Sequence, residues 1–75
     1  PDYSVSMKAS EDMSYQDTLI LAMNREKAAY RLYNDLAART NDSAAKNLFL
    51  VLAQEEAKHK LRFEIEYDEN VLKEN

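Results

Sequence analysis

Three residues of this chain carry side chains that bind metal ions in proteins. Glu56 and His59 form a Glu-x-x-His pattern, and His59 is the only histidine among the 75 residues. Residues i and i+3 are neighbours on a helix, so a carboxylate and an imidazole at this spacing can address one ion. Glu26 lies midway along an earlier apolar stripe. A buried carboxylate is costly without a compensating partner, so we expect these three side chains to share a cation.

The ligand types limit which metal fits. Mixed carboxylate and imidazole ligation suits iron or manganese, with zinc as a competitor. A metal-free alternative stays open, because Glu-x-x-His also occurs by chance on polar helices. In that case His59 would bond to Glu55, four residues earlier on the same helix.

Composition restricts the elements that can position these residues. The chain contains no glycine, no cysteine and one proline, so a turn-rich β fold is excluded and a mostly helical chain is expected. Without cysteine there is no disulfide, zinc-thiolate or iron-sulfur site. The net charge of −4 disfavours binding to nucleic acid or anionic lipid. No apolar run approaches the roughly 20 residues of a membrane span, so we expect a soluble chain, and the lack of cysteine fits a reducing, cytoplasmic setting.

The pattern predicts a first helix over residues 15–39. Residues 1–13 lack a sustained period, and we expect them to form a flexible arm or linker. Ser14 followed by Asp17 resembles a capping box, in which the hydroxyl accepts a backbone N–H. One stripe then follows at helical spacing: Tyr15, Leu19, Ala22, Glu26, Ala29, Tyr30, Tyr33 and Ala37.

A second helix is predicted to run to about residue 70. Asn41 can take a left-handed C-cap conformation, and Asp42 or Ser43 can cap the next helix. The inward face of that helix holds Ala45, Leu48, Phe49, Leu52, Glu56, His59, Phe63 and Tyr67. Because the connection is short, the helices should be antiparallel. Glu26 and Glu56 are then equally far from residue 41, which places them at one level.

Residues 14–75 are therefore expected to form an all-α antiparallel helical hairpin, which would be half of a four-helix bundle. Two helices cover only one side of each other, and chains below roughly 80 residues need a metal or oligomerisation for stability. A homodimer, or a higher homo-oligomer, is the simplest remedy, since a two-fold axis uses one patch twice. A second apolar row, away from the first stripes, suggests another interface: Leu21, Ala28, Leu32, Leu50, Leu61, Ile65 and Leu72.

Two stretches, "AMNREKAAYRLYNDLA" and "LFLVLAQEEAKHK", resemble the rubrerythrin-like branch of the ferritin-like superfamily over residues 15–72. The resemblance implies a four-helix bundle with a non-haem di-iron centre. In this reading Glu26 is the first-helix ligand, Glu56 and His59 are the second-helix pair, and Tyr33 matches a tyrosine near the metals. Two copies would supply the carboxylate-rich ligand set of ferritin-like di-iron and di-manganese proteins.

The same resemblance implies a ferroxidase, or an oxidoreductase that reacts with oxygen or peroxide. Family members often carry both helix pairs in one chain, so this sequence is expected to match the C-terminal pair, with an N-terminal half missing. With no cysteine-ligated iron available, the electron donor would be a separate molecule. Members that reduce peroxide efficiently carry another carboxylate one turn past the first ligand, where Ala29 stands here. The alternative function is a metal-free or zinc-bound helical assembly module.

Overall fold

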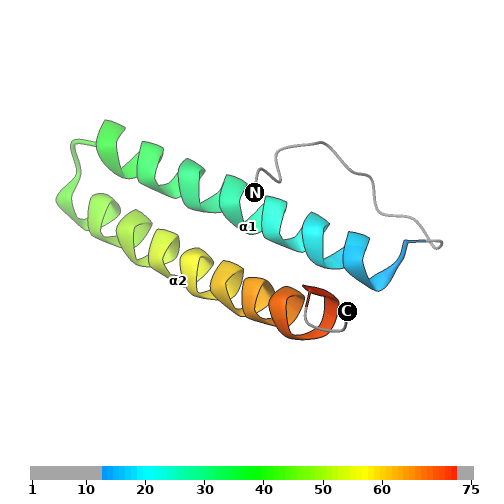
Figure 1. The fold of residues 1–75 in the computed structure, drawn as a ribbon. Coiled ribbons are helices and arrows are strands. Elements are labelled where there is room, and N and C mark those ends of the chain that lie inside the picture. The colour runs from blue at the N-terminus through cyan, green and yellow to red at the C-terminus, as the bar shows by residue number, and fades with distance from the viewer. Residues whose placement is uncertain (1–12, 73–75) are drawn as a thin grey trace.

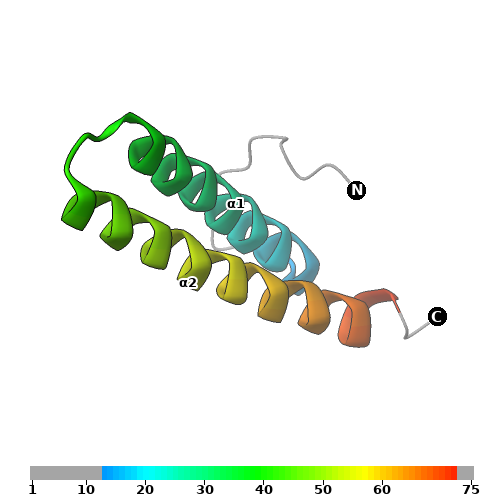
Figure 2. The same cartoon turned by 90° about the vertical axis from the view of Figure 1, so that its left-hand side faces the viewer.

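The computed structural model describes residues 13–72 and contains two antiparallel helices of equal length (Figure 1). Helix α1 spans Tyr15–Arg39 and helix α2 spans Ser43–Tyr67, followed by a short π-helix, η1, over Asp68–Leu72. The predicted bounds of the first helix are confirmed, as is the all-helical hairpin. The expected arm lies outside the described residues except for Met13. Seen from the side, α1 and α2 run next to each other from the turn to the opposite end (Figure 2).

Helix α1 begins where the sequence predicted a cap. The Ser14 hydroxyl accepts a hydrogen bond from the Asp17 amide at 3.0 Å, and its backbone is extended. The Ser14 carbonyl accepts from the Thr18 amide at 2.9 Å, which starts the helical ladder. The Asp17 carboxylate also lies in the first turn, where the positive end of the helix dipole favours negative charge.

The turn between the helices differs from the prediction at Asn41. No residue within 13–72 has a positive φ, so the left-handed cap at Asn41 is wrong. Thr40 instead ends α1 with an extended backbone, at φ −80° and ψ 142°, while its amide still donates to Leu36 O. The Thr40 hydroxyl then accepts from the Asp42 amide at 3.2 Å. The chain reverses through two extended residues and a side-chain hydrogen bond, so the left-handed conformation is not required.

Helix α2 begins at an Asp cap. The Asp42 carboxylate accepts from the Ala44 amide at 2.9 Å and from the Ala45 amide at 3.3 Å. Ser43 is the first helical residue, so Asp42 is the cap of the two candidates.

The end of α2 also differs from the prediction. The α-helix ends at Tyr67, before the predicted residue 70, and the chain continues as the π-helix Asp68–Leu72. The Asn70 side chain donates to Glu66 O at 3.1 Å. That carbonyl is the one that accepts the backbone amide of residue 70 in a regular α-helix, and the turn widens here into the π-helix.

The core between the helices is small. Its buried apolar side chains are Leu19, Met23, Ala37 and Ala53, and Met23 is 1% exposed. Large apolar side chains remain exposed elsewhere: Tyr15, Tyr30, Leu32, Leu48, Leu50, Val51, Leu61, Ile65 and Leu72. Neither helix within residues 13–72 has the length and hydropathy needed to cross a membrane. Two helices alone therefore leave much of their apolar surface uncovered, as expected for a hairpin of this size.

Candidate metal centre

The two helices bring Glu26, Glu56 and His59 together midway along the hairpin. One ligand atom from each side chain lies within 4.8 Å of the others. His59 Nδ1 is 3.5 Å from Glu26 Oε2 and 3.9 Å from Glu56 Oε2. The prediction that these side chains meet at one level is confirmed. Their binding of a metal stays a prediction.

The Glu26 carboxylate faces both Glu56 and His59 but is incompletely hydrogen-bonded. Its Oε2 atom is buried and accepts no hydrogen bond from the residues that the structure describes. Burial raises the pKa of Glu26, and the hydrogen-bonding contact and negative charge of Glu56 raise it further, whereas His59 lowers it. Two carboxylates so close together repel each other when both are ionised. A cation among the three groups would satisfy the orphaned oxygen and remove this repulsion.

The donor set fits a divalent transition metal. Two carboxylates and one imidazole provide hard and borderline ligands, which suit iron, manganese or zinc. Three ligands leave coordination positions open, as in a site that reacts with a small molecule or is completed by another chain. The side chains of Glu26 and Glu56 are 19% and 21% exposed, and that of His59 is 49% exposed. The cluster is therefore sheltered within the seam and accessible from the His59 side.

The metal-free alternative for His59 is not the arrangement found. Glu55, its expected partner, lies 3.3 Å from Lys58 Nζ in an exposed ion pair. His59 Nδ1 instead faces the two carboxylates of the cluster.

Tyr33 lies farther along α1 and packs against an aromatic ring of α2. Its ring stacks on Phe49 with centroids 6.4 Å apart and an interplanar angle of 15°. Aromatic packing in this geometry stabilises the seam between the helices. A role of the Tyr33 hydroxyl beside the metal ligands stays a prediction.

Sequence reasoning missed the contacts that join the open end of the hairpin. The Tyr15 hydroxyl donates a hydrogen bond to Glu66 Oε1, and Gln16 Nε2 donates to the Tyr67 hydroxyl at 3.1 Å. The hydrogen bond to Glu66 is the largest cause of a raised pKa at Tyr15. Both pairs link residues far apart in the sequence, so no local pattern could reveal them. We call these two contacts the end clasp.

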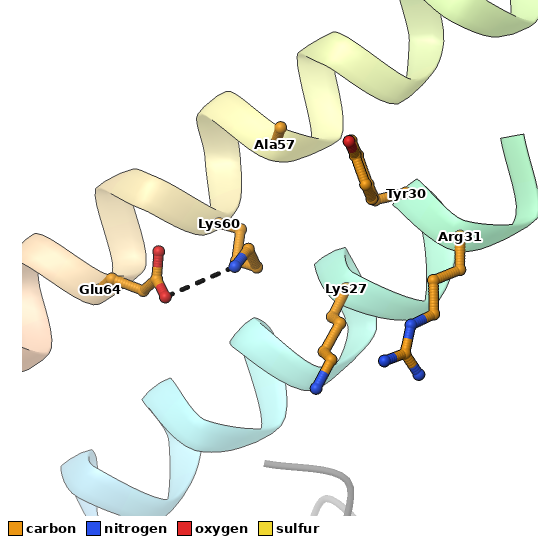
Figure 3. A pocket seen from close by; sticks show the side chains of 6 residues that line it. All are labelled: Lys27, Tyr30, Arg31, Ala57, Lys60 and Glu64. Carbon is orange, nitrogen blue, oxygen red and sulfur yellow. Dashed lines mark hydrogen bonds and ion pairs between the residues drawn. The ribbon is translucent and has the colours of Figure 1, made fainter. Parts of the chain in front are cut away.

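A groove between the helices was also missed. It is lined by Lys27, Tyr30, Arg31, Ala57, Lys60 and Glu64 (Figure 3). Three of these six residues are basic, although the whole chain has a net charge of −4. We call it the basic groove. The sequence signal for it was the pair Lys27 and Arg31. Like charges at i and i+4 do not stabilise a helix.

Comparison with known proteins identifies the family. The family model described as Rubrerythrin matches residues 5–67, which is most of the chain. No curated protein and no solved structure matches the chain. The candidate ligands Glu26, Glu56 and His59 all fall inside the matched range. Given the extent of that match, this chain belongs to the rubrerythrin family.

Proposed function

We propose that this chain is half of a ferritin-like di-iron carboxylate protein. Two copies would pair about a two-fold axis into a four-helix bundle, and each would bring Glu26, Glu56 and His59 to a shared centre. An N-terminal half from a longer form of the same protein could take the place of the second copy. The family assignment and the residue cluster support this proposal.

The observation that carries the proposal is the orphaned oxygen of Glu26. It is buried beside a second carboxylate and an imidazole without a hydrogen-bond donor among residues 13–72. Proteins rarely bury a carboxylate oxygen without a donor or a cation. A structural role alone would be served better by an apolar side chain at this position.

Each residue has a distinct task in this proposal. Glu56 and His59 hold one ion from the same helix face, and Glu26 approaches it from the opposite helix. The two carboxylates would hold the ions and offset their positive charge. When bound, iron supplies an Fe(II)/Fe(III) couple for reaction with oxygen or peroxide. Electrons for repeated turnover would come from a separate donor.

Oxidation of iron is favoured over reduction of peroxide. Ala29 lies one turn past Glu26, where efficient peroxide-reducing relatives are expected to carry a further carboxylate. An alanine there provides neither a ligand nor a proton donor. We therefore place ferroxidase chemistry first.

Anaerobic titration with Fe(II), followed by native mass spectrometry, tests the proposal. We expect two iron ions per pair of chains, and loss of iron in Glu56→Ala and His59→Ala. Glu55→Ala is the matched control, because Glu55 is the adjacent carboxylate and pairs with Lys58 outside the cluster. Iron binding near zero, or equal loss in Glu55→Ala, would contradict a site built from these residues.

A second function is favoured by the apolar residues outside the cluster. Leu50, Leu61 and Ile65 on α2 are 41%, 55% and 53% exposed, which suits a helical assembly module without metal or with structural zinc. In the metal-free case, His59→Leu should stabilise the oligomer, because pairing would cover the half-exposed imidazole and an apolar side chain there needs no polar partner. In the zinc case, the iron-loaded protein should lack colour change and redox cycling. Weakening of the oligomer in His59→Leu would argue against the metal-free module.

A further inference from the structure

Helix α2 carries an exposed apolar row on the side away from His59. The residues of this row, Leu50, Leu61 and Ile65, are 41%, 55% and 53% exposed. Each residue turns an α-helix by about 100°, so Leu50 and Leu61 lie about 120° and 140° from Glu56 around the helix axis. His59 lies about 60° from Glu56 in the opposite sense. The row, which we call the outer row, is therefore separate from the accessible side of the metal cluster.

Opposite charges border the outer row. Lys46 lies about one turn before Leu50, and Glu64 lies about one turn after Leu61. The two charged residues are about five turns apart, so their side chains leave the helix in the same direction and flank the same edge of the row. About 27 Å of helix separates them, so they cannot meet within one chain. Among the described residues, the Lys46 side chain has no ion pair, while Glu64 lies 3.5 Å from Lys60.

A second copy that lies antiparallel along the outer row brings these charges together. When Leu50 of one chain packs against Leu61 of the other, Lys46 comes within about one residue of the level of Glu64 in the second copy. In an antiparallel helix pair, the same edge of each helix faces the same side of the interface, so the two charges become neighbours. Two-fold symmetry makes each contact twice. The outer row and the charges beside it are therefore self-complementary.

The residues at the centre of this pairing favour close approach of the helices. The two-fold axis passes between Gln54 and Ala57, of which one carries an uncharged amide and the other a single methyl group. Small side chains at a contact allow a short distance between helix axes. A two-fold axis at Leu61 would instead carry Lys46 beyond the described end of the second α2 and away from Glu64. The charges thus select the first register.

We propose that the outer row of α2 binds a second copy of this chain in antiparallel orientation. Leu50 packs against Leu61 of the second copy, and Lys46 pairs with Glu64 of the second copy. The metal cluster stays outside this interface, so the inference goes beyond the proposed di-iron function and does not rest on it. A chain that uses both this interface and the metal-centred pairing belongs to an assembly larger than a dimer.

Disulfide cross-linking tests the proposal, because the chain contains no cysteine of its own. Leu50→Cys and Leu61→Cys are mixed under oxidation by glutathione, and isotope labelling of one variant lets its intact mass identify the mixed dimer. Facing positions of packed helices come within reach of a disulfide, whereas two copies of the same position lie about 16 Å apart along the pair. We expect the mixed dimer to form at least about tenfold faster than either variant links to itself.

Leu48→Cys is the matched control. Leu48 and Leu61 are both 55% exposed, but Leu48 lies on the other side of α2 from the outer row. Mixed with Leu61→Cys, this control should link at least about tenfold more slowly than Leu50→Cys does. The Leu50→Cys and Leu61→Cys mixture should link at the same rate with a chelator present and with Glu56→Ala added to both chains, which separates this result from the metal proposal.

Exchange of the charges tests the register. Added to both cysteine variants, Lys46→Glu or Glu64→Lys places like charges beside each other at both ends of the interface and should slow linking about threefold or more. Lys46→Glu/Glu64→Lys restores opposite charges and should link at close to the parent rate. That recovery distinguishes a contact between chains from the loss of the Lys60 contact in Glu64→Lys.

Three outcomes would overturn the proposal. One is the absence of any preference for the mixed dimer, and another is equally fast linking of the Leu48→Cys control. The third is faster linking of Leu61→Cys to itself than to Leu50→Cys, which would show a different register.

Discussion

The environment of one oxygen atom, Glu26 Oε2, governs the electrostatics at the middle of the hairpin. It is buried without a hydrogen-bond donor in the described part of the chain and faces His59 at 3.5 Å. Burial and the neighbouring Glu56 disfavour the charged form of the Glu26 carboxyl group, so the metal-free chain is less stable when Glu26 is ionised. A bound cation reverses that preference, because the same negative charge then becomes a ligand.

The raised pKa of Glu26 predicts a pH dependence of the metal-free chain. Its folded-state pKa lies above the unfolded value of 4.5, so its stabilising contribution is full below pH 4.5. That contribution is lost as the pH rises through the higher folded-state pKa. In the presence of a chelator, the free energy of unfolding of the parent chain should therefore fall between pH 4.5 and 7. That of Glu26→Gln should vary less over the same range.

Urea unfolding followed by circular dichroism at several pH values measures this effect. Glu55→Gln is the control, since Glu55 is exposed and paired with Lys58. A parent chain and a Glu26→Gln variant with parallel pH profiles would contradict the prediction.

At the scale of elements, the helix caps set where α1 and α2 begin. Ser14 and Asp42 each place a side-chain oxygen on backbone amides at a helix start. Asp42 also helps to set the register of the two helices, because the position of the turn decides whether Glu26 lies opposite Glu56. This cap thus contributes to the geometry of the cluster from a distance.

Replacing Asp42 should destabilise α2 more than replacing its neighbour Ser43. Asp42→Ala removes the acceptor for the Ala44 and Ala45 amides and should cost about 1 kcal/mol of unfolding free energy. Ser43→Ala is the matched control, because Ser43 lies inside the helix and is not its cap. Chemical denaturation of both variants measures the difference. Equal losses in the two variants would show that Asp42 does not act as the cap.

Local chemistry explains which elements could be predicted from the sequence. The start of α1 followed from Ser14 and Asp17, because a cap and its amide lie within one turn. The meeting of Glu26 with Glu56 followed from equal distances to a short turn. The Asn41 cap was wrong because a hydrogen bond from the Asp42 amide to Thr40 allows a turn with negative φ throughout residues 13–72.

Contacts between the helices could not be read from either helix alone. The end clasp depends on which rotamers Tyr15 and Gln16 adopt beside α2, and the basic groove depends on how closely the helices approach. Helical periodicity gives the face of a residue but not its depth in the seam. Tyr30 illustrates this limit, since it lies on the predicted inward stripe and is 41% exposed.

For the whole molecule, the small core makes association important. Four side chains are buried among residues 13–72, whereas Leu48, Val51 and Leu61 are each more than half exposed. Burial of apolar surface contributes roughly 25 cal/mol per Å², and the exposed apolar side chains of a lone hairpin do not make that contribution. A second chain would supply it.

Thermal stability should therefore depend on protein concentration. If two chains fold as one unit, each tenfold rise in concentration should add about 1.4 kcal/mol of apparent stability. Circular dichroism melts over a hundredfold range of concentration, with sedimentation velocity at the same concentrations, measure this dependence. A melting temperature independent of concentration, from a monomer, would contradict the paired bundle.

Metal should stabilise the assembly by mass action. At free Fe(II) one hundred times its Kd, under anaerobic conditions, binding to the folded state should add about 2.7 kcal/mol. Addition of a chelator should return the melting temperature to its starting value. Glu55→Ala should respond as the parent chain does, whereas Glu56→Ala should not. An equal response in Glu56→Ala would place the metal elsewhere.

The end clasp connects the two helices at the end of the hairpin opposite the turn. The covalent turn joins one end, and the contacts of Tyr15 and Gln16 with α2 join the other. An ion at Glu26, Glu56 and His59 would cross-link the two helices at mid-length and divide the seam into two shorter spans. Backbone amides near this cross-link should then exchange with deuterium more slowly upon metal loading, while those beside the turn keep their rates.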